Sequence, residues 1–249
     1  MKISIITATF NSSSTIADCI SSVNNQTYQN IEHIIIDGFS TDNSLEIIKN
    51  TPNRTTKVVS EKDNGIYDAM NKGIRLASGD IIGILNSDDL YYDNLVLEKV
   101  ANIFKKTKVN CIHADLYYVN KVNTYQIVRH WRTSDYIIGA FRKGWHPAHP
   151  TFFVRKEVYE KYGLFNLDFS LAADFELMLR LLDRYHITSF YLPEPIVRMR
   201  LGGATSKSIR NIIKQNIECY KAFKVNGLKV SPLYPLYRLL PKLKQFFHA

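Results

Sequence analysis

The sequence predicts an α/β fold in which helices flank a mostly parallel, Rossmann-like central sheet. Over the first hundred residues, short β-branched runs alternate with segments of helical period, which is the pattern of β-α-β units. The chain has 249 residues, of which 45% are hydrophobic and 22% charged, so it can form a sizeable core and is not disordered. Eleven Gly, eight Pro and no repeated tract exclude collagen-like, low-complexity and solenoid architectures.

The elements of the first half follow from hydrophobic period. Four β-branched runs predict buried strands, and the segments between them place apolar residues at helical spacing. The strands are expected at residues 3–7, 31–36, 57–60 and 81–85, and the helices at residues 16–23, 44–48 and 66–77.

The second half is less regular. Strands are expected near residues 109–114, 124–128 and 151–154, a helix over 175–185, and a strand pair at 187–192 and 196–201. Two glycines at 202–203 indicate a hinge. After it comes a helix over 209–223 that is apolar on one side and basic on the other.

The net charge of +9 is unevenly distributed. Residues 1–206 carry 23 Lys and Arg against 22 Asp and Glu, whereas residues 207–249 carry nine against the single acid Glu218. We therefore divide the chain into a catalytic domain, residues 1–206, and a basic C-terminal extension, residues 207–249.

Several classes of protein are disfavoured by what the sequence lacks. No apolar run is long enough to cross a bilayer, and the N-terminus enters a strand pattern rather than a signal peptide. Cys19, Cys111 and Cys219 are widely spaced and are expected to be free thiols. The sequence motifs of dinucleotide oxidoreductases, P-loop NTPases, serine hydrolases and zinc proteases do not occur.

Three polar clusters directly follow predicted strands, at residues 9–14, 37–42 and 86–89. The carboxyl ends of parallel strands lie at one edge of a sheet, where ligands bind. In the last cluster, Asp88 and Asp89 repel each other unless a cation or solvent exposure relieves the repulsion. A hard divalent ion and a solvated turn explain this pair about equally well.

Other candidate residues also allow two interpretations. Asp37 could accept hydrogen bonds from a base or ribose, or could form a turn before Gly38. Asp174 could be a general base held toward a cleft, but N-cap preferences alone favour a helix cap. His146 and His149 do not have zinc spacing, and we interpret them as loop residues near a substrate.

Several stretches together carry a family resemblance. Those with the clearest motifs are SIITATFN at 4–11, EHIIIDGFSTD at 32–42, LNSDD at 85–89 and ADFEL at 173–177, and residues 19–28, 71–80, 149–153 and 162–165 add to them. In content and order they closely resemble the family 2 glycosyltransferases, which have the GT-A fold. The resemblance covers roughly residues 3–206, and several motifs in order are more specific than any one.

The resemblance implies an inverting enzyme that moves a sugar from a nucleotide-sugar donor, by expectation UDP-linked, to a hydroxyl of a glycan or lipid-linked acceptor in cell-surface polysaccharide biosynthesis. It implies that Asp174 is the base and that Asp88 is the acid of the DxD element, helped by Asp89, which binds Mg²⁺ or Mn²⁺. The residues implied around the nucleotide are Thr7, Phe10, Asn11, Asp37, Asp63, Asn71 and Asn86.

The sequence departs from the family pattern at two positions. The first acid of the DxD element is Asn86, so two carboxylate ligands are not assured. Met70 stands where many relatives carry an Arg. The stretch from Glu61 to Gly73 instead resembles a subgroup from bacterial surface-polysaccharide assembly, in which Asp63 contributes to the donor site.

The C-terminal extension lies outside the resemblance. Residues 234–247 mix aromatic and aliphatic side chains with cations, which suits an anionic membrane surface. We expect peripheral attachment at the cytoplasmic face of the bacterial inner membrane, where a polyprenyl-linked acceptor would be found. The alternative is that the helix over 209–223 packs on the catalytic domain.

Two other functions remain to be distinguished. Asn86 allows a catalytically inactive relative that keeps the nucleotide site. A basic nucleic-acid-binding protein is less favoured, because its charge would come from the extension alone and no reading motif is recognised. We therefore expect no nucleic-acid partner.

Overall fold

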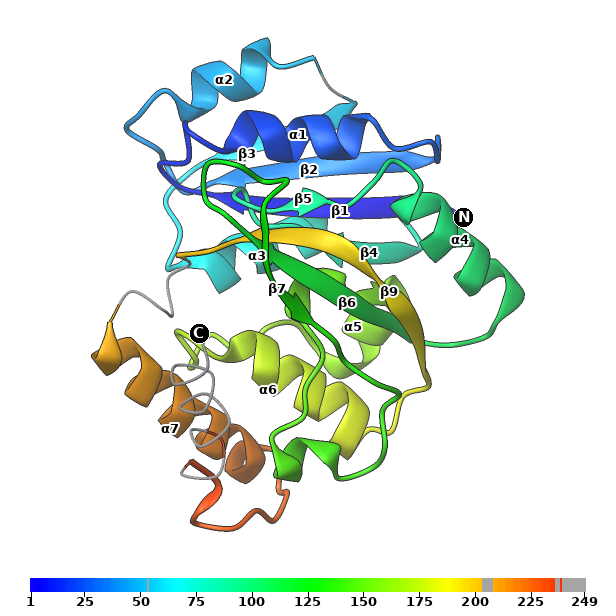
Figure 1. Cartoon of the computed structure of the whole chain (residues 1–249), viewed down its shortest axis with the longest axis vertical. Helices are drawn as coiled ribbons and strands as arrows, with labels where there is room; N and C mark the ends of the chain where they lie inside the picture. Colours follow the sequence, from blue (N-terminus) through cyan, green and yellow to red (C-terminus); the bar gives the residue numbers. More distant parts are fainter. Residues whose placement is uncertain (53, 203–207, 236–237, 239–249) are drawn as a thin grey trace.

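The computed structural model contains one nine-stranded sheet with helices on both faces (Figure 1). It describes residues 1–52, 54–202, 208–235 and 238. Four parallel strands form one half of the sheet in the order β3-β2-β1-β4, which confirms the predicted α/β class. Their bounds are β1 Ile3–Thr9, β2 Ile31–Asp37, β3 Thr55–Ser60 and β4 Ile81–Ile84.

The other half of the sheet is mixed, so the parallel arrangement is confined to fewer strands than the sequence predicts. Strand β8 (Phe153–Arg155) runs antiparallel between β4 and β6 (Cys111–Val119). Strand β6 pairs in parallel with β9 (Ser189–Arg200). The antiparallel strands β7 (Ile127–Trp131) and β5 (Leu90–Tyr91) pair with β6 and β9 respectively.

The strand pair predicted over residues 187–201 is a single strand. Strand β9 continues through Pro193 and Pro195, and its pairing with β6 shifts register on both sides of Asp115. Proline cannot donate to a strand ladder. Pro193 and Pro195, which suggested a break between two strands, therefore mark an irregular stretch within the single strand β9.

The helices form two layers. One face of the sheet is covered by α1 (Ile16–Asn24), α2 (Ser44–Asn50) and α4 (Val96–Lys106). The other face is covered by α3 (Ile66–Leu76), α5 (Lys156–Tyr162), α6 (Ala173–Leu179) and α7 (Ile209–Val225). A π-helical turn, Arg180–Arg184, continues α6, and 3₁₀ turns occur at Ala140–Lys143 and His149–Thr151. Helix α3 can pack closely against β1 because residue 73 is a glycine. A Cβ added at Gly73 would lie only 2.3 Å from Cγ2 of Ile6.

A buried carboxylate secures the amino-terminal edge of the parallel strands. Glu32 is 3% exposed and accepts hydrogen bonds from the Lys2 ammonium, the Ser4 hydroxyl, and the Ser78 amide and hydroxyl at 2.5–2.8 Å. Burial opposes ionisation of Glu32, but these hydrogen bonds lower its pKa to about 2. The ionised carboxylate therefore holds β1, β2 and the α3–β4 connection together.

Helix α7 packs against α6 and shares its core. Cys219, Ala222 and Phe223 are buried in the same cluster as α6, and the ring of Phe223 lies 6.1 Å from that of Phe175. Tyr234, beyond α7, is also buried there. The buried side of α7 thus packs on the catalytic domain, which is the alternative that was given for this helix.

Glu218 of α7 holds the loop that leads into α6. Its carboxylate accepts hydrogen bonds from the backbone amides of Ser170, Leu171 and Ala172 at 3.2, 2.8 and 2.9 Å, and from the Ser170 hydroxyl at 2.8 Å. Amides at a helix N-terminus need such acceptors. The single acid of the basic extension thus caps a helix of the catalytic domain.

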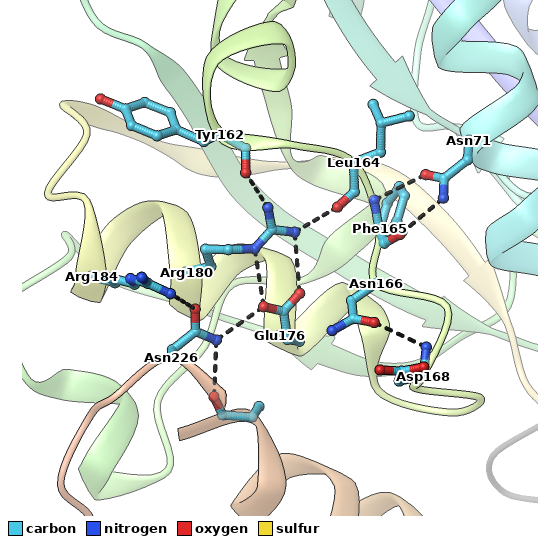
Figure 2. A network of polar contacts seen from close by, with 11 residues as sticks. Asn71, Tyr162, Leu164, Phe165, Asn166, Asp168, Glu176, Arg180, Arg184 and Asn226 are labelled. Atoms are coloured by element: carbon cyan, nitrogen blue, oxygen red, sulfur yellow. Dashed lines mark hydrogen bonds and ion pairs between the residues drawn. The ribbon is translucent and has the colours of Figure 1, made fainter. Parts of the chain in front are cut away.

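A second set of polar contacts joins the end of α7 to α6 (Figure 2). The Asn226 amide donates to Glu176 Oε1 at 2.9 Å, and Arg180 pairs with the same carboxylate at 3.0 Å. Arg180 also donates to the Leu164 carbonyl at 2.6 Å. Glu176 is 2% exposed, so these partners compensate for the burial of its charge.

The sequence predicts free cysteines and no apolar segment long enough to cross a bilayer. Cys19, Cys111 and Cys219 are all buried and form no disulfide, as expected. Among the described residues, no helix combines the length and the apolar character needed to cross a bilayer.

We expect Glu32→Gln to lower the free energy of unfolding by about 2 kcal/mol at pH 7, because buried donors lose a charged acceptor. The wild-type carboxylate has a folded pKa of about 2 against an ordinary 4.5. Its contribution is present above pH 4.5 and is lost as the pH falls toward 2. Urea unfolding should therefore show a smaller difference between the two proteins at pH 3, with exposed Glu46→Gln as control. An equal difference at both pH values would contradict this account.

We expect Glu218→Ala to lower the free energy of unfolding by about 2 kcal/mol, since three amides, of which that of Ala172 is buried, lose a charged acceptor. Hydrogen exchange at the Leu171 and Ala172 amides should accelerate. Glu157→Ala, which removes an exposed acid of α5, should change neither quantity. Unchanged exchange at the two amides would show that the loop does not depend on Glu218.

Candidate functional site

The three polar clusters predicted from the sequence lie together at the carboxyl edge of the parallel strands. The hydroxyls of Ser12 and Ser87 are 2.8 Å apart, which joins the first cluster to the third. The Ser13 amide donates to Asp42 at 3.0 Å, which joins the first to the second. The strand order reverses between β1 and β4, and such a switch point is where open α/β sheets bind ligands.

Asp37 and Asn11 shape the loops at this edge. Asp37 is fully buried, and its carboxylate accepts hydrogen bonds from the Ser40 amide at 3.1 Å and the Ser60 hydroxyl at 2.6 Å. Asn11 has φ +49° and accepts a hydrogen bond from the Thr41 amide at 2.9 Å. Both side chains therefore order the surface on which a ligand would lie.

Phe10 and Asp63 meet over Gly38. A Cβ added at Gly38 would lie 2.5 Å from Oδ2 of Asp63 and 3.5 Å from Cδ2 of Phe10. A side chain at position 38 would therefore displace the Asp63 carboxylate. The Phe10 side chain is 59% exposed, which leaves an aromatic face beside a carboxylate, a combination able to contact a base.

Asn86, Asp88 and Asp89 form the turn that follows β4. The Asn86 amide donates to Nε2 of His149 at 3.0 Å and to Asp89 at 3.4 Å. Asp89 is 1% exposed, and burial, reinforced by the Asp88 charge, raises its pKa well above the usual range. Asp88 is partly exposed. Of the predicted metal-binding acids, only Asp88 is therefore open to solvent.

This turn offers oxygen atoms that fit a hard divalent cation. Oδ1 of Asn86 and Oδ1 of Asp89 are buried and accept no hydrogen bond from the described residues. Two such acceptors beside the Asp88 carboxylate favour a cation, since each is costly to bury unpaired. Within the described residues, however, no three His, Cys, Asp or Glu side chains form a metal-binding group. A bound ion would therefore take most of its ligands from substrate and water.

Arg200 supports the turn from β9, and it is not among the residues predicted from the sequence. Its guanidinium is 4% exposed, donates to the Asp88 carbonyl at 2.8 Å and to the Lys121 carbonyl at 3.1 Å, and pairs with Asp18. These partners lie between 79 and 182 residues from Arg200 in sequence. No local pattern could have indicated them.

Asp174 lies in the first turn of α6, next to Tyr67 and His149. The Tyr67 hydroxyl donates to Oδ1 of Asp174 at 3.0 Å, and Nδ1 of His149 lies 3.4 Å from Oδ2. Burial and the Asp174 charge raise the pKa of Tyr67, so its hydroxyl remains a donor. The Asp174 side chain is 20% exposed, which leaves it accessible to a substrate.

His149 joins the turn after β4 to Asp174. Burial lowers the pKa of His149, although the charges of Asp174 and Asp88 oppose that shift. The imidazole is therefore neutral near pH 7. Because Nε2 faces the donating Asn86 amide, Nδ1 carries the proton and faces Asp174. The interpretation of His149 as a loop residue near a substrate understated its contacts.

Asp174 does not cap α6. The N-cap of α6 is Ala172, and no side chain of α6 itself caps it. Glu218 supplies the acceptors instead, from 46 residues away. The cap that N-cap preferences favour at position 174 is therefore wrong, and the Asp174 carboxylate is left free to face Tyr67 and His149.

Two residues predicted near the nucleotide are used elsewhere in the structure. Thr7 is fully buried, and its hydroxyl lies 2.9 Å from Nε2 of His33. Asn71 is 2% exposed, and both ends of its amide bond the Phe165 backbone at 2.9 Å (Figure 2). Neither side chain therefore reaches the carboxyl edge of the sheet. The sequence did not reveal this, because spacing alone does not show which way a side chain points.

The family model Glycosyl transferase family 2 matches residues 4–163. A curated relative from Mycobacterium tuberculosis, a PGL/p-HBAD biosynthesis glycosyltransferase, is 27% identical over 209 residues, which are 83% of this chain and 79% of the relative.

Solved structures share the fold at low sequence identity. Staphylococcus aureus TarS 1–349, in complex with UDP-GlcNAc, has a TM-score of 0.70 and 16% identity over 100% of this chain and 74% of that one. The chain spans 44% of the longer TarS structure. The mannosyltransferase PcManGT from Pyrobaculum calidifontis, in complex with GDP-Man and Mn²⁺, has a TM-score of 0.66 and 18% identity over 96% of this chain and 69% of that one.

These matches agree with the geometry of the site. The family model covers the three polar clusters and His149, and the TM-scores of 0.70 and 0.66 show that the structural neighbours share the fold. The chain belongs to the family 2 glycosyltransferases and has the GT-A fold.

Proposed function

We propose that this protein transfers a sugar from a nucleotide-sugar donor to an acceptor hydroxyl, with inversion at the anomeric carbon. The observation that carries the proposal is the contact sequence Asn86–His149–Asp174, in which the Asn86 amide bonds Nε2 of His149 and Nδ1 lies 3.4 Å from Oδ2 of Asp174. It ties a turn with cation-binding oxygens to an accessible carboxylate. Leaving-group stabilisation and proton removal would then occur on two sides of one reacting carbon.

The donor would lie along the carboxyl edge of β1, β2 and β4. Phe10 and Asp63 would contact the nucleoside, on loops ordered by Asn11 and Asp37. Asp88, with Oδ1 of Asn86 and Asp89, would hold Mg²⁺ or Mn²⁺ on the diphosphate. When bound, such an ion neutralises charge on the leaving diphosphate.

Asp174 would act on the acceptor. Its carboxylate takes the hydroxyl proton as the acceptor oxygen bonds to the anomeric carbon, while the bond from that carbon to the diphosphate oxygen breaks. The electron pair of the broken bond leaves with the nucleoside diphosphate. The Tyr67 hydroxyl donates to Oδ1 of this carboxylate, and Nδ1 of His149 lies 3.4 Å from Oδ2, so the two groups orient it toward the acceptor.

We take UDP as the expected nucleotide and a glycan or lipid-linked hydroxyl as the expected acceptor. TarS has been solved with UDP-GlcNAc, and the mycobacterial relative bears the name of a glycolipid biosynthesis enzyme. An acceptor on a lipid would be met at a membrane, in a bacterium at the cytoplasmic face of the inner membrane. Most of the segment predicted to bind there, residues 234–247, lies outside the described residues.

We expect Asp174→Asn to reduce the turnover rate by about 10²–10⁴-fold, the usual contribution of a general base. Binding of UDP, measured by calorimetry, should remain at the wild-type level because Asp174 is not part of the donor surface. Asp168→Asn removes an exposed acid upstream of α6 and should retain activity. Full activity of Asp174→Asn would contradict the base assignment.

We expect Asp88→Asn to weaken UDP binding in the presence of Mn²⁺ by about tenfold, or ~1.4 kcal/mol. Binding of UDP without the metal should change little, because the nucleoside contacts remain. Asp80→Asn, at the opposite edge of the sheet, is the matched control. If Mn²⁺ does not strengthen UDP binding to the wild type, metal dependence is wrong. If UDP binds but no nucleotide sugar is consumed, the protein is a non-catalytic relative.

A further inference from the structure

The solvent-facing side of α7 has a surface that the catalytic chemistry does not use. Ile209, Ile213 and Ile217 are spaced four residues apart, which places them on one face of the helix. Their side chains are 77%, 52% and 59% exposed. Three large aliphatic side chains in a row are seldom left in water without a partner. We call this row the isoleucine stripe.

Cations accompany the isoleucine stripe. Arg210 and Lys214 follow Ile209 and Ile213 by one residue, and both are exposed. Among the described residues, no acid forms a salt bridge with either. Lys221 and Lys224 continue this side of the helix, where each lies over an aromatic ring at about 5 Å.

The two faces of α7 differ in both polarity and sign of charge. The inner face is buried against α6, and it includes Glu218, the only acid of the helix, which is occupied by the 170–172 loop. The outer face therefore combines aliphatic side chains with positive charge and no acid. In Figure 1 this helix lies beside α6 at the lower end of the molecule, far from α1 and α2.

We propose that the outer face of α7 docks on an anionic phospholipid surface. A helix that lies in a membrane interface inserts apolar side chains between the headgroups while neighbouring cations contact anionic lipid. The isoleucine stripe and its flanking Arg210 and Lys214 have this arrangement. A nucleic acid would contact the cations but would leave the isoleucines exposed. Charge complementarity alone does not distinguish these partners, and the stripe favours lipid.

Membrane attachment was expected from the sequence at residues 234–247. Helix α7, which the structure describes, would provide such an attachment in addition or instead. It also has a geometric consequence, because one helix would touch lipid on one side and hold the loop before Asp174 on the other. An acceptor anchored in the membrane would then be presented near α6. Docking itself does not depend on sugar transfer, so the two proposals can fail separately.

The test is flotation of the full-length protein with phosphatidylcholine vesicles, with and without phosphatidylglycerol. Truncation after Gly227 would be unsuitable, since Tyr234 is buried in the α6 core. The wild type should bind vesicles that contain phosphatidylglycerol. The double variant Ile213→Gln/Ile217→Gln should bind at least about tenfold more weakly, and glutamine retains helix propensity. Lys214→Gln should weaken binding only to the anionic vesicles.

Val122→Gln, at an exposed position 91% accessible in the β6–β7 connection, is the matched control and should bind like the wild type. Melting temperature and UDP binding should be unchanged in every variant. Wild-type binding by the double variant, or no wild-type binding to anionic vesicles, would overturn the proposal. Two other results would also overturn it: a lower melting temperature of the double variant, meaning that the chain itself covers the stripe, and duplex RNA binding that depends on Lys214 but not on the isoleucines.

Discussion

The link between Asn86 and Asp174 through a neutral His149 is the interaction on which the arrangement of the site depends. A neutral imidazole has one acceptor and one donor, so it can bond an amide on one side and face a carboxylate on the other. His149 occupies this position because the 3₁₀ turn before β8 lies beside the end of β4. The antiparallel insertion of β8 therefore brings together two groups that lie 88 residues apart in the chain.

Side chains that are distant in sequence also hold the loop before α6 and the turn after β4 in place. The loop before α6 depends on Glu218 for its amide partners, and the carbonyl of Asp88 depends on Arg200. In each case a buried charge satisfies backbone groups of a functional loop from another element. Helix α7 is therefore an integral part of the fold: its single acid faces inward, while its cations Arg210, Lys214, Lys221 and Lys224 face solvent.

Local pattern was sufficient for the parallel half of the sheet, because β-branched runs and helical period directly specify buried strands and amphipathic helices. It was also sufficient to place three polar clusters at one edge. Strand β9 was misjudged because its prolines occur within one irregular strand. The bonds from Glu218 to the start of α6 and the inward bonds of Thr7 and Asn71 were missed for another reason. Each depends on a partner distant in sequence, which neither spacing nor propensity encodes.

The asparagine at position 86 is best understood together with His149. An aspartate there would place a carboxylate against Nε2 of the imidazole, and that contact would be favourable only if Nε2 carried a proton. With the proton on Nε2, a neutral ring would turn the lone pair of Nδ1 toward the Asp174 carboxylate, which is unfavourable. A ring protonated on both nitrogens would be a cation, and burial of His149 opposes that charge. The amide of Asn86 donates instead and preserves the proton that faces Asp174. The departure from the DxD pattern thus keeps the imidazole neutral and leaves Asp88 as the exposed acid of the turn.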